Sequence, residues 1–329
     1  MTKAFLIKTA ALVATALASA DAQLETVKLK HPSGSSAEVF LFGAHVKSFR
    51  AAVDPELDIL FMSKGSFLDG IKPIRGGIPL IFPNFGSLEG FPSHGFARIT
   101  NWTLVSHEDA KEKESPSVAT FSMASSDSTR TIWPVDFELT YEVKLYADQL
   151  KTALHVRNTF EKPIDFHALL HNYLWVDDVR DKGVQVKGLK GVEYFDKVSK
   201  TNETETRELI DFSAQTDNVY RNAPDLVSAI IKGVKAIDRT VTVEKSGSIT
   251  GGAGTKSGVR DPDEAKGVET ETDIVLWNPW AERAATMEDF VAEEYKNMVA
   301  IEPGRVSEKQ VLPNGQTYTL QQIISVRTT

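Results

Sequence analysis

Alternation of apolar and polar residues dominates the clearest segments of this chain. Residues Phe137–Leu145 read F-E-L-T-Y-E-V-K-L and alternate without a break, as a strand with one buried face requires. The residues Tyr146–Gln149 then form a polar turn, and the alternation resumes over 150–156. This pattern predicts a β-hairpin.

The same kind of pattern recurs along most of the chain. Strand-like segments occur at Val118–Met123, Thr240–Glu244 and Thr317–Val326, and short apolar segments lie between Ala37 and Phe49. A helical period is rare, and its best example, Glu282–Tyr295, is short. No internal repeat is visible. We therefore predict an all-β, mostly antiparallel protein with few short helices.

One stretch, Arg75–Arg98, follows neither period. It reads R-G-G-I-P-L-I-F-P-N-F-G-S-L-E-G-F-P-S-H-G-F-A-R and is rich in glycine and proline. Its apolar run at 78–82 argues against disorder, and a long ordered loop of this kind is usually functional. Its glycines suggest backbone bends, or close approach of a ligand, that a Cβ would obstruct.

A second irregular stretch, Lys245–Thr272, has a different character. It contains S-G-S-I-T-G-G-A-G-T-K-S-G followed by a charged run with one proline. This composition predicts a flexible, Gly-rich surface insertion. A neutral insertion, a lid over a site and a partner-binding loop are all compatible with it.

Composition and charge narrow the functions further. The chain has 329 residues, is 41% hydrophobic and carries a formal charge of −8, so it can bury a full core. It has no basic block, and nucleic-acid binding is therefore not expected. Because cysteine is absent, thiol catalysis and cysteine-ligated zinc are excluded. An anionic substrate would need local positive charge, for which Arg75 and Arg98 are candidates.

The N-terminal residues resemble a secretory leader. Lys3 and Lys8 precede an Ala/Leu/Val run, and small residues follow around Ala20 and Ala22, which predicts cleavage after one of these two alanines. A buried N-terminal helix and a mitochondrial presequence are alternatives. No later run reaches the ~20 apolar residues of a membrane span. We expect a secreted protein without a membrane anchor, or a cytoplasmic one if the leader is not used.

Three titratable residues stand out in strand-like surroundings. His167 and His171 have a spacing that suits a metal on a helix, but the neighbouring β-branched and aromatic residues favour a strand. Four residues of strand span ~13 Å, too far for one ion to bridge, so no metal is expected. Glu302 follows the apolar run 298–301, and Pro303–Gly304 is expected to end that strand. A solvated glutamate at the end of a strand is the alternative for Glu302.

Several separated motifs, found in one order along residues 25–327, carry a family resemblance. They include R-G-G-I-P, F-P-N-F-G, H-G-F-A-R-x-x-x-W, A-L-L-H-N-Y-L-W-V, T-D-N-V-Y, W-N-P-W and V-A-I-E-P-G. Together they resemble the glucose-6-phosphate 1-epimerase branch of the aldose 1-epimerase (mutarotase) family. The resemblance implies a galactose-mutarotase-like β-sandwich over residues 21–329 and an isomerase without a cofactor.

The resemblance also implies roles in the chemistry. His171 matches the family's general acid and Glu302 its general base. Interconversion of sugar anomers takes a proton from the C1 hydroxyl and gives one to the ring oxygen, which this pair can do without a metal or nucleotide. The segment 278–280 of W-N-P-W is expected to shape the pocket. Pro303 departs from the alanine that is common there, which stiffens the local backbone.

The substrate-binding residues follow from the same comparison. Arg75 and Arg98 match arginines that hold a 6-phosphate, and a planar guanidinium suits phosphate oxygens. A surface ion pair is the alternative for each arginine. His94 matches a residue near the ring oxygen or C1, and Asp217 one that accepts sugar hydroxyls. Ser93 replaces a glutamine of the family, so one direct contact to the sugar is expected to be lost or bridged by water.

The functional hypothesis is interconversion of the α and β anomers of a hexose 6-phosphate, with glucose 6-phosphate as the best guess. The expected partner is this small sugar phosphate, and the protein is expected to be a monomer. An aldose 1-epimerase acting on neutral sugars is an alternative that secretion favours. A secreted carbohydrate-binding protein without catalysis is another, but a pure binder does not need both His171 and Glu302.

Overall fold

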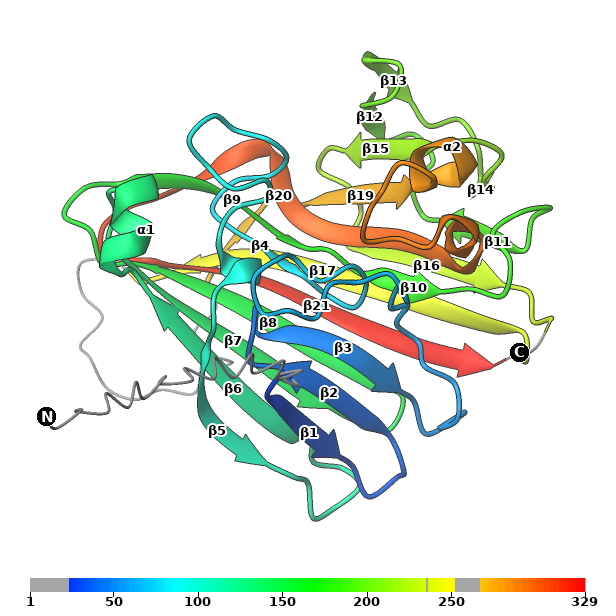
Figure 1. Ribbon diagram of the computed structural model, residues 1–329, viewed down its shortest axis with the longest axis horizontal. Helices are drawn as coiled ribbons and strands as arrows, with labels where there is room; N and C mark the ends of the chain where they lie inside the picture. Colours follow the sequence, from blue (N-terminus) through cyan, green and yellow to red (C-terminus); the bar gives the residue numbers. More distant parts are fainter. Residues whose placement is uncertain (1–23, 235, 252–266, 329) are drawn as a thin grey trace, which may run out of the picture.

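The computed structural model describes residues 24–234, 236–251 and 267–328. In this part of the chain the strands form three antiparallel sheets, and the helices are few and short (Figure 1). The all-β prediction is therefore confirmed. The first sheet has the order β1-β2-β3. Its strands are β1 (Thr26–Lys30), β2 (Ser36–Phe40) and β3 (His45–Arg50).

The second sheet has the order β13-β12-β15-β19-β20-β9-β4, and β10 also pairs with β20. Its long central strand is β20 (Met298–Leu312), which lies between β19 and β9. The other strands are β4 (Leu80–Ile81), β9 (Ile164–Leu170), β10 (Tyr173–Trp175), β12 (Glu193–Asp196), β13 (Thr201–Thr204), β15 (Thr216–Tyr220) and β19 (Asp273–Asn278).

The third sheet has the order β14-β11-β16-β17-β21-β8-β7-β6-β5, with β18 paired to β17. Its strands are β5 (Thr103–Glu108), β6 (Ser117–Ala124), β7 (Phe137–Leu145), β8 (Gln149–Asn158), β11 (Val184–Lys187), β14 (Leu209–Ile210), β16 (Leu226–Ile231), β17 (Arg239–Thr250), β18 (Val268–Thr270) and β21 (Thr317–Thr328).

The core lies between the second and third sheets, as in a sandwich. Phe166 of β9 contacts Tyr318 of β21, with ring centroids 5.8 Å apart. The predicted hairpin is confirmed, because β7 pairs with β8 and Leu145 lies opposite Leu150. The alternating apolar residues of β7 are the buried ones. Burial of this continuous apolar face is the main stabilising contribution to the hairpin.

The helices are shorter than the sequence pattern indicates. The expected helix over Glu282–Tyr295 is wrong, because two short helices with an irregular segment between them replace it. Within that segment Asp289 pairs with Arg75, and Phe290 packs against Phe61 at 5.7 Å between ring centroids. These contacts keep the segment between the two short helices from forming a helix. The helices are α1 (Asp127–Ile132), α2 (Trp280–Ala284), η1 (Ala97–Ile99) and η2 (Ala292–Asn297).

Strand β20 does not end at Pro303–Gly304, so that part of the prediction is wrong. Pro303 lies opposite Ile274 of β19, and the strand continues to Leu312. A Cβ on Gly304 would lie 2.8 Å from Cβ of Leu169, so glycine lets β20 and β9 approach closely. Glu302 is therefore an interior strand residue.

The Gly-rich insertion has narrower bounds than predicted. Residues 245–250 continue strand β17 and pair with β21, and β18 pairs back onto β17. Gly247 permits this pairing, because a Cβ there would lie 2.6 Å from side-chain atoms of Thr270 and Thr272. The centre of the insertion, 252–266, and the predicted leader lie outside the described residues, so flexibility and secretion stay predictions.

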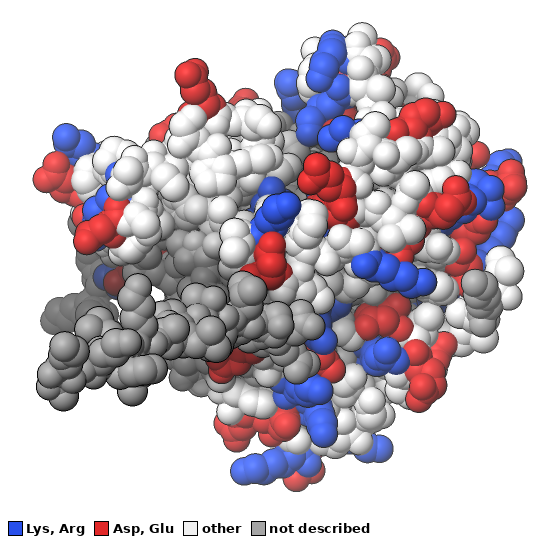
Figure 2. All heavy atoms as spheres, in the orientation of Figure 1, with Lys and Arg blue, Asp and Glu red and all other residues white. Residues whose placement is uncertain are grey.

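The surface carries interspersed charges. On the face shown in Figure 2, Lys and Arg alternate with Asp and Glu, and no large patch of one sign covers the described part. No helix in the described ranges is long and apolar enough to cross a membrane.

Candidate active site

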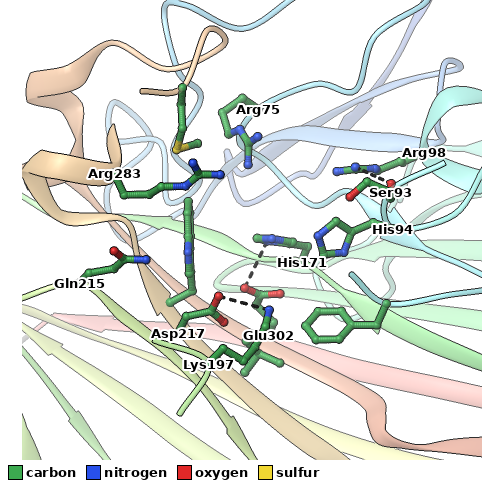
Figure 3. Close-up of a pocket in the computed structure, with 14 residues that line it drawn as sticks. Arg75, Ser93, His94, Arg98, His171, Lys197, Gln215, Asp217, Arg283 and Glu302 are labelled. Atoms are coloured by element: carbon green, nitrogen blue, oxygen red, sulfur yellow. Dashed lines mark hydrogen bonds and ion pairs between the residues drawn. The ribbon is translucent and has the colours of Figure 1, made fainter. Parts of the chain in front are cut away.

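A cavity of about 240 Å³ lies over strands β15, β19 and β20 of the second sheet (Figure 3). The seven residues predicted to react with or bind the substrate all line it, so the fold brings together positions from distant segments. Residues 278–280, which were predicted to shape the pocket, are not among its lining residues. The lining residues are Arg75, Phe85, Ser93, His94, Arg98, His171, Lys197, Gln215, Asp217, Val275, Trp277, Arg283, Met287 and Glu302.

Glu302 forms the floor of the cavity. It lies opposite Val275 of β19, and pairing on both sides of β20 fixes its backbone. The residue is only 1% exposed, and its Oε2 is buried without a hydrogen-bond partner among the described residues. Burial, followed by the nearby charge of Asp217, raises the pKa of Glu302 well above its ordinary value. A solvated glutamate at a strand end is excluded by this burial.

His171 follows directly after β9 and faces Glu302. Its backbone N–H donates to the carbonyl of Pro79 at 3.1 Å, and its Nδ1 lies 3.4 Å from Oε1 of Glu302. The imidazole stacks on the ring of Tyr173, with centroids 4.6 Å apart and planes 6° from parallel. Burial, then the neighbouring His94 and the positive charges of Arg75 and Arg98, lowers the pKa of His171 well below its ordinary value.

His94 lies beside His171, at the tip of the predicted functional loop. The two ring centroids are 6.0 Å apart. The backbone of His94 has φ 61°, and the next residue, Gly95, has φ 76°. A Cβ on Gly95 would lie 2.0 Å from the carbonyl oxygen of Phe82, so glycine alone fits this bend. Burial and the charge of Arg98 lower the pKa of His94, which favours a neutral ring.

The two predicted arginines occupy the opposite wall from the carboxylates. Arg75 is held by Asp289, with Nε to Oδ2 at 3.1 Å, and its Nη1 donates to the hydroxyl of Tyr173 at 2.9 Å. Arg98 donates from Nη2 to the carbonyl of Ser93 at 2.7 Å, and its Nε is buried without a partner among the described residues. Burial, and then Arg75, lowers the pKa of Arg98 to about 10, so it stays charged at neutral pH.

Asp217 lies on β15 and forms an ion pair that the sequence did not indicate. Nζ of Lys197 is 3.2 Å from Oδ2 of Asp217 and 4.7 Å from the centre of the Phe85 ring. Burial raises the pKa of Asp217 above its ordinary value. The lysine holds the carboxylate at the cavity wall and leaves room for contact with a polar ligand.

Sequence reasoning missed several lining residues. Arg283 projects from α2 toward the same side as Arg75 and Arg98 (Figure 3). It follows W-N-P-W by three positions, so this motif could have pointed to it. Lys197 comes from a turn without a recognisable motif. Within W-N-P-W itself, Trp277 lines the cavity, and Asn278 is buried and donates to the carbonyls of Tyr295 and Met298.

This arrangement supplies two chemical functions. A buried carboxyl and an imidazole at 3.4 Å can move protons on a bound molecule, because their pKa values are displaced in opposite directions. The guanidinium groups on the other wall can bind an anion. A cavity that combines both is the default location for catalysis.

Comparisons with known proteins agree with this geometry. The model of the family described as "Aldose 1-epimerase" matches residues 25–325. A "Putative glucose-6-phosphate 1-epimerase" from Cenchrus ciliaris is 30% identical over 302 residues, which cover 90% of this chain and 82% of that protein. A protein of the same name from Escherichia coli is 30% identical over 309 residues, covering 92% of this chain and 91% of its own.

A solved structure supports the fold as well. The "putative mutarotase (YeaD)" from Salmonella typhimurium has a TM-score of 0.76 and 26% identity, and the match covers 93% of this chain and 92% of that one. The family model spans nearly all of the chain, including every residue that lines the cavity. This protein belongs to the aldose 1-epimerase family.

Proposed function

We propose that this protein interconverts the α and β anomers of a hexose 6-phosphate, with glucose 6-phosphate as its first substrate. The observation that carries the proposal is the buried pair of Glu302 and His171, 3.4 Å apart, in a cavity that also contains several arginines. Two relatives named for the reaction on glucose 6-phosphate, at 30% identity, point the same way.

In the proposed mechanism the ring opens and closes by paired proton transfers. The carboxylate of Glu302 takes the proton of the C1 hydroxyl while the imidazolium of His171 gives a proton to the ring oxygen. The C1–O bond of the ring breaks, C1 becomes an aldehyde, and rotation about C1–C2 exposes its other face. Closure reverses both transfers and leaves each residue as it began. Each positioned transfer contributes ~10²–10⁴-fold.

The other residues bind the sugar phosphate. Arg75 and Arg98 are assigned to the 6-phosphate, for which a charged, planar donor group is suited. Asp217 accepts hydrogen bonds from sugar hydroxyls while Lys197 holds it. His94, kept neutral by burial and neighbouring charge, contributes a polar contact near the ring oxygen or C1. Ser93 places its carbonyl against Arg98 and orients that arginine.

The direct test is NMR measurement of anomer exchange on the protein, comparing glucose 6-phosphate with glucose and galactose. We expect faster exchange of the phosphorylated sugar and a loss of ~10²–10⁴-fold in Glu302→Gln. Glu308→Gln is a matched control, because Glu308 lies on the same strand with a side chain 77% exposed.

The alternatives predict different results. Equal exchange of neutral sugars would replace the proposal with an aldose 1-epimerase for those sugars. Sugar binding without exchange, from folded protein, would leave only a carbohydrate-binding role.

A further inference from the structure

The polar side chains of the cavity are segregated by charge. Figure 3 shows guanidinium groups along one wall, the two histidines between, and the carboxyl groups on the opposite side. The groups, in this order across the cavity, are Arg75, Arg98, Arg283, His94, His171, Asp217 and Glu302. Acid–base chemistry and anion binding are therefore adjacent.

Two of the three arginines carry charge that the protein leaves uncompensated. Arg75 has Asp289 as a partner at 3.0 Å. Arg98 instead donates to the carbonyl of Ser93, and Arg283 to the hydroxyl of Thr286 at 3.2 Å. Within the described ranges neither of these two has a carboxylate at ion-pair distance. Arg98 is also 9% exposed and has a buried Nε that makes no hydrogen bond.

This positive charge acts on His171. The imidazole is buried, and its Nδ1 makes no aligned hydrogen bond within the described structure. Burial and the positive charges of Arg75 and Arg98 disfavour its protonation, while burial and Asp217 favour a protonated Glu302. Both side chains are buried, and His171 Nδ1 and Glu302 Oε2 make no hydrogen bond within the described ranges, so the free protein favours the uncharged form of the pair, a carboxylic acid beside a neutral imidazole. Catalysis in the proposed direction requires the opposite state, a carboxylate beside an imidazolium.

We propose that the phosphate group of the substrate switches this pair on: by binding among Arg75, Arg98 and Arg283, it cancels the positive charge around His171 and draws the proton from Glu302 onto the imidazole. The inference rests on the proposed function. The O–H bond of the Glu302 carboxyl breaks and an N–H bond forms on His171, so charge separates within the pair without any other reactant.

Other charged groups around the pair do not oppose this transfer. Lys197 and Asp217 neutralise each other at 3.2 Å. Tyr173 faces His171 as a neutral phenol, because burial raises its pKa. Figure 3 places the histidines between the arginines and Glu302, so an anion bound to Arg75, Arg98 and Arg283 lies nearer to His171 than to Glu302 and changes the field at His171 more. The phosphate contributes to catalysis as well as to affinity.

The test supplies the sugar and the phosphate as two separate molecules, glucose and inorganic phosphate. Anomer exchange of glucose is measured by NMR with increasing inorganic phosphate, with the enzyme-free rate subtracted and sodium chloride as the ionic-strength control. We expect the enzymatic rate to rise at least about ten-fold to a plateau, the change that one pKa unit in His171 gives. Arg98→Met and Arg283→Met should each reduce this activation, and Glu302→Gln should abolish it.

Competition between inorganic phosphate and glucose 6-phosphate, measured in the same samples, distinguishes failure of this inference from failure of the proposed function. Inorganic phosphate that competes with glucose 6-phosphate but leaves glucose exchange unchanged would overturn the inference and keep the proposed function. The same holds if inorganic phosphate does not compete at all. Absence of exchange on glucose 6-phosphate itself would instead overturn the proposed function.

A second readout does not depend on turnover. Nitrogen-15 NMR of histidine reports the protonation of His171 at constant pH while inorganic phosphate is added. We expect the ring signals to move from the neutral to the imidazolium form in the wild type and to move much less in Arg98→Met. An imidazole that is already charged without phosphate, or that stays neutral at saturation, contradicts the inference.

Discussion

Nη1 of Arg75 donates a 2.9 Å hydrogen bond to the hydroxyl of Tyr173, and the ring of Tyr173 lies parallel to that of His171. The side chain assigned to the phosphate and the one assigned to proton transfer therefore share a neighbour. Asp289 holds the same guanidinium from the other side. A change at Tyr173 should affect substrate binding through Arg75 while leaving His171 in place.

Tyr173→Phe tests this connection. The variant keeps the aromatic stack and loses one hydrogen bond of Arg75, and such a bond contributes about 0.5–1.5 kcal/mol. We expect KM for glucose 6-phosphate to rise ~2- to 10-fold, with a smaller change for glucose. Steady-state anomer exchange measures both. Tyr194→Phe, at a tyrosine that does not line the cavity, is the control, and an unchanged KM in Tyr173→Phe would contradict the assignment.

Arg98→Lys tests how the phosphate is held. A lysine ammonium carries its N–H groups on one nitrogen, so it cannot donate to the Ser93 carbonyl and also reach the phosphate from the separate nitrogens that a guanidinium offers. Loss of one charge-assisted hydrogen bond costs about 1.5–3 kcal/mol. We therefore expect KM for glucose 6-phosphate to rise ~10- to 100-fold, and neutral sugars to be affected far less. Arg130→Lys, at an exposed ion pair with Asp136, is the control and should leave KM for both kinds of sugar unchanged. Equal losses on both sugars would assign Arg98 a structural role.

The buried carboxyl of Glu302 should make stability depend on pH. Its folded pKa lies above its ordinary value of 4.5, so the folded state binds the proton more tightly than the unfolded state does. This contribution is fully present below the unfolded pKa and declines as pH rises toward the folded pKa. Relative to the wild type, Glu302→Gln should thus gain stability with rising pH, by at most about 1.4 kcal/mol per pH unit.

Urea denaturation at a series of pH values from about 5 to 8 measures this difference. Glu308→Gln, on the same strand but exposed, should run parallel to the wild type. Parallel curves for Glu302→Gln would show that the carboxyl ionises in the folded state as it does in water.

Asp273 is expected to stabilise strand β20, which carries Glu302. Its Oδ2 accepts from the backbone N–H groups of Val306 and Ser307 at 2.7 and 2.8 Å, where the register of β20 shifts against β9. Asn222 N–H and the Ser307 hydroxyl donate to the other oxygen, Oδ1. In Asp273→Asn one of the two oxygens becomes an NH2 group that faces donors, and the polar groups left without an acceptor cost about 1–3 kcal/mol. Urea denaturation should show this loss. Asp165→Asn, at an exposed ion pair, is the matched control, and equal stability of the two variants would refute the role.

The sequence was informative where a local pattern determines the structure. The unbroken alternation of Phe137–Leu145 predicted a strand that the structure confirms. Glycine and proline likewise indicated the loop that carries His94. The family motifs located the seven predicted site residues, all of which line the cavity, although their roles in catalysis remain predictions.

Features that depend on distant contacts could not be predicted. The pattern of Glu282–Tyr295 suits a helix, but contacts of Asp289 and Phe290 to the N-terminal part of the chain break it. Pro303 suggested a strand end, and only the packing of Gly304 against Leu169 shows why β20 continues. Lys197 reaches the site through sheet pairing, for which no local signal exists.

The residues proposed to transfer protons and the arginines proposed to bind the phosphate sit on different kinds of structure. Glu302 is interior to a strand paired on both sides, and His171 directly follows another strand of the same sheet. Arg75, Arg98 and Arg283 instead lie on loops and short helices. In evolution, phosphate recognition can therefore change by substitutions in loops and short helices, while the sheet preserves the positions of the proposed proton-transfer residues.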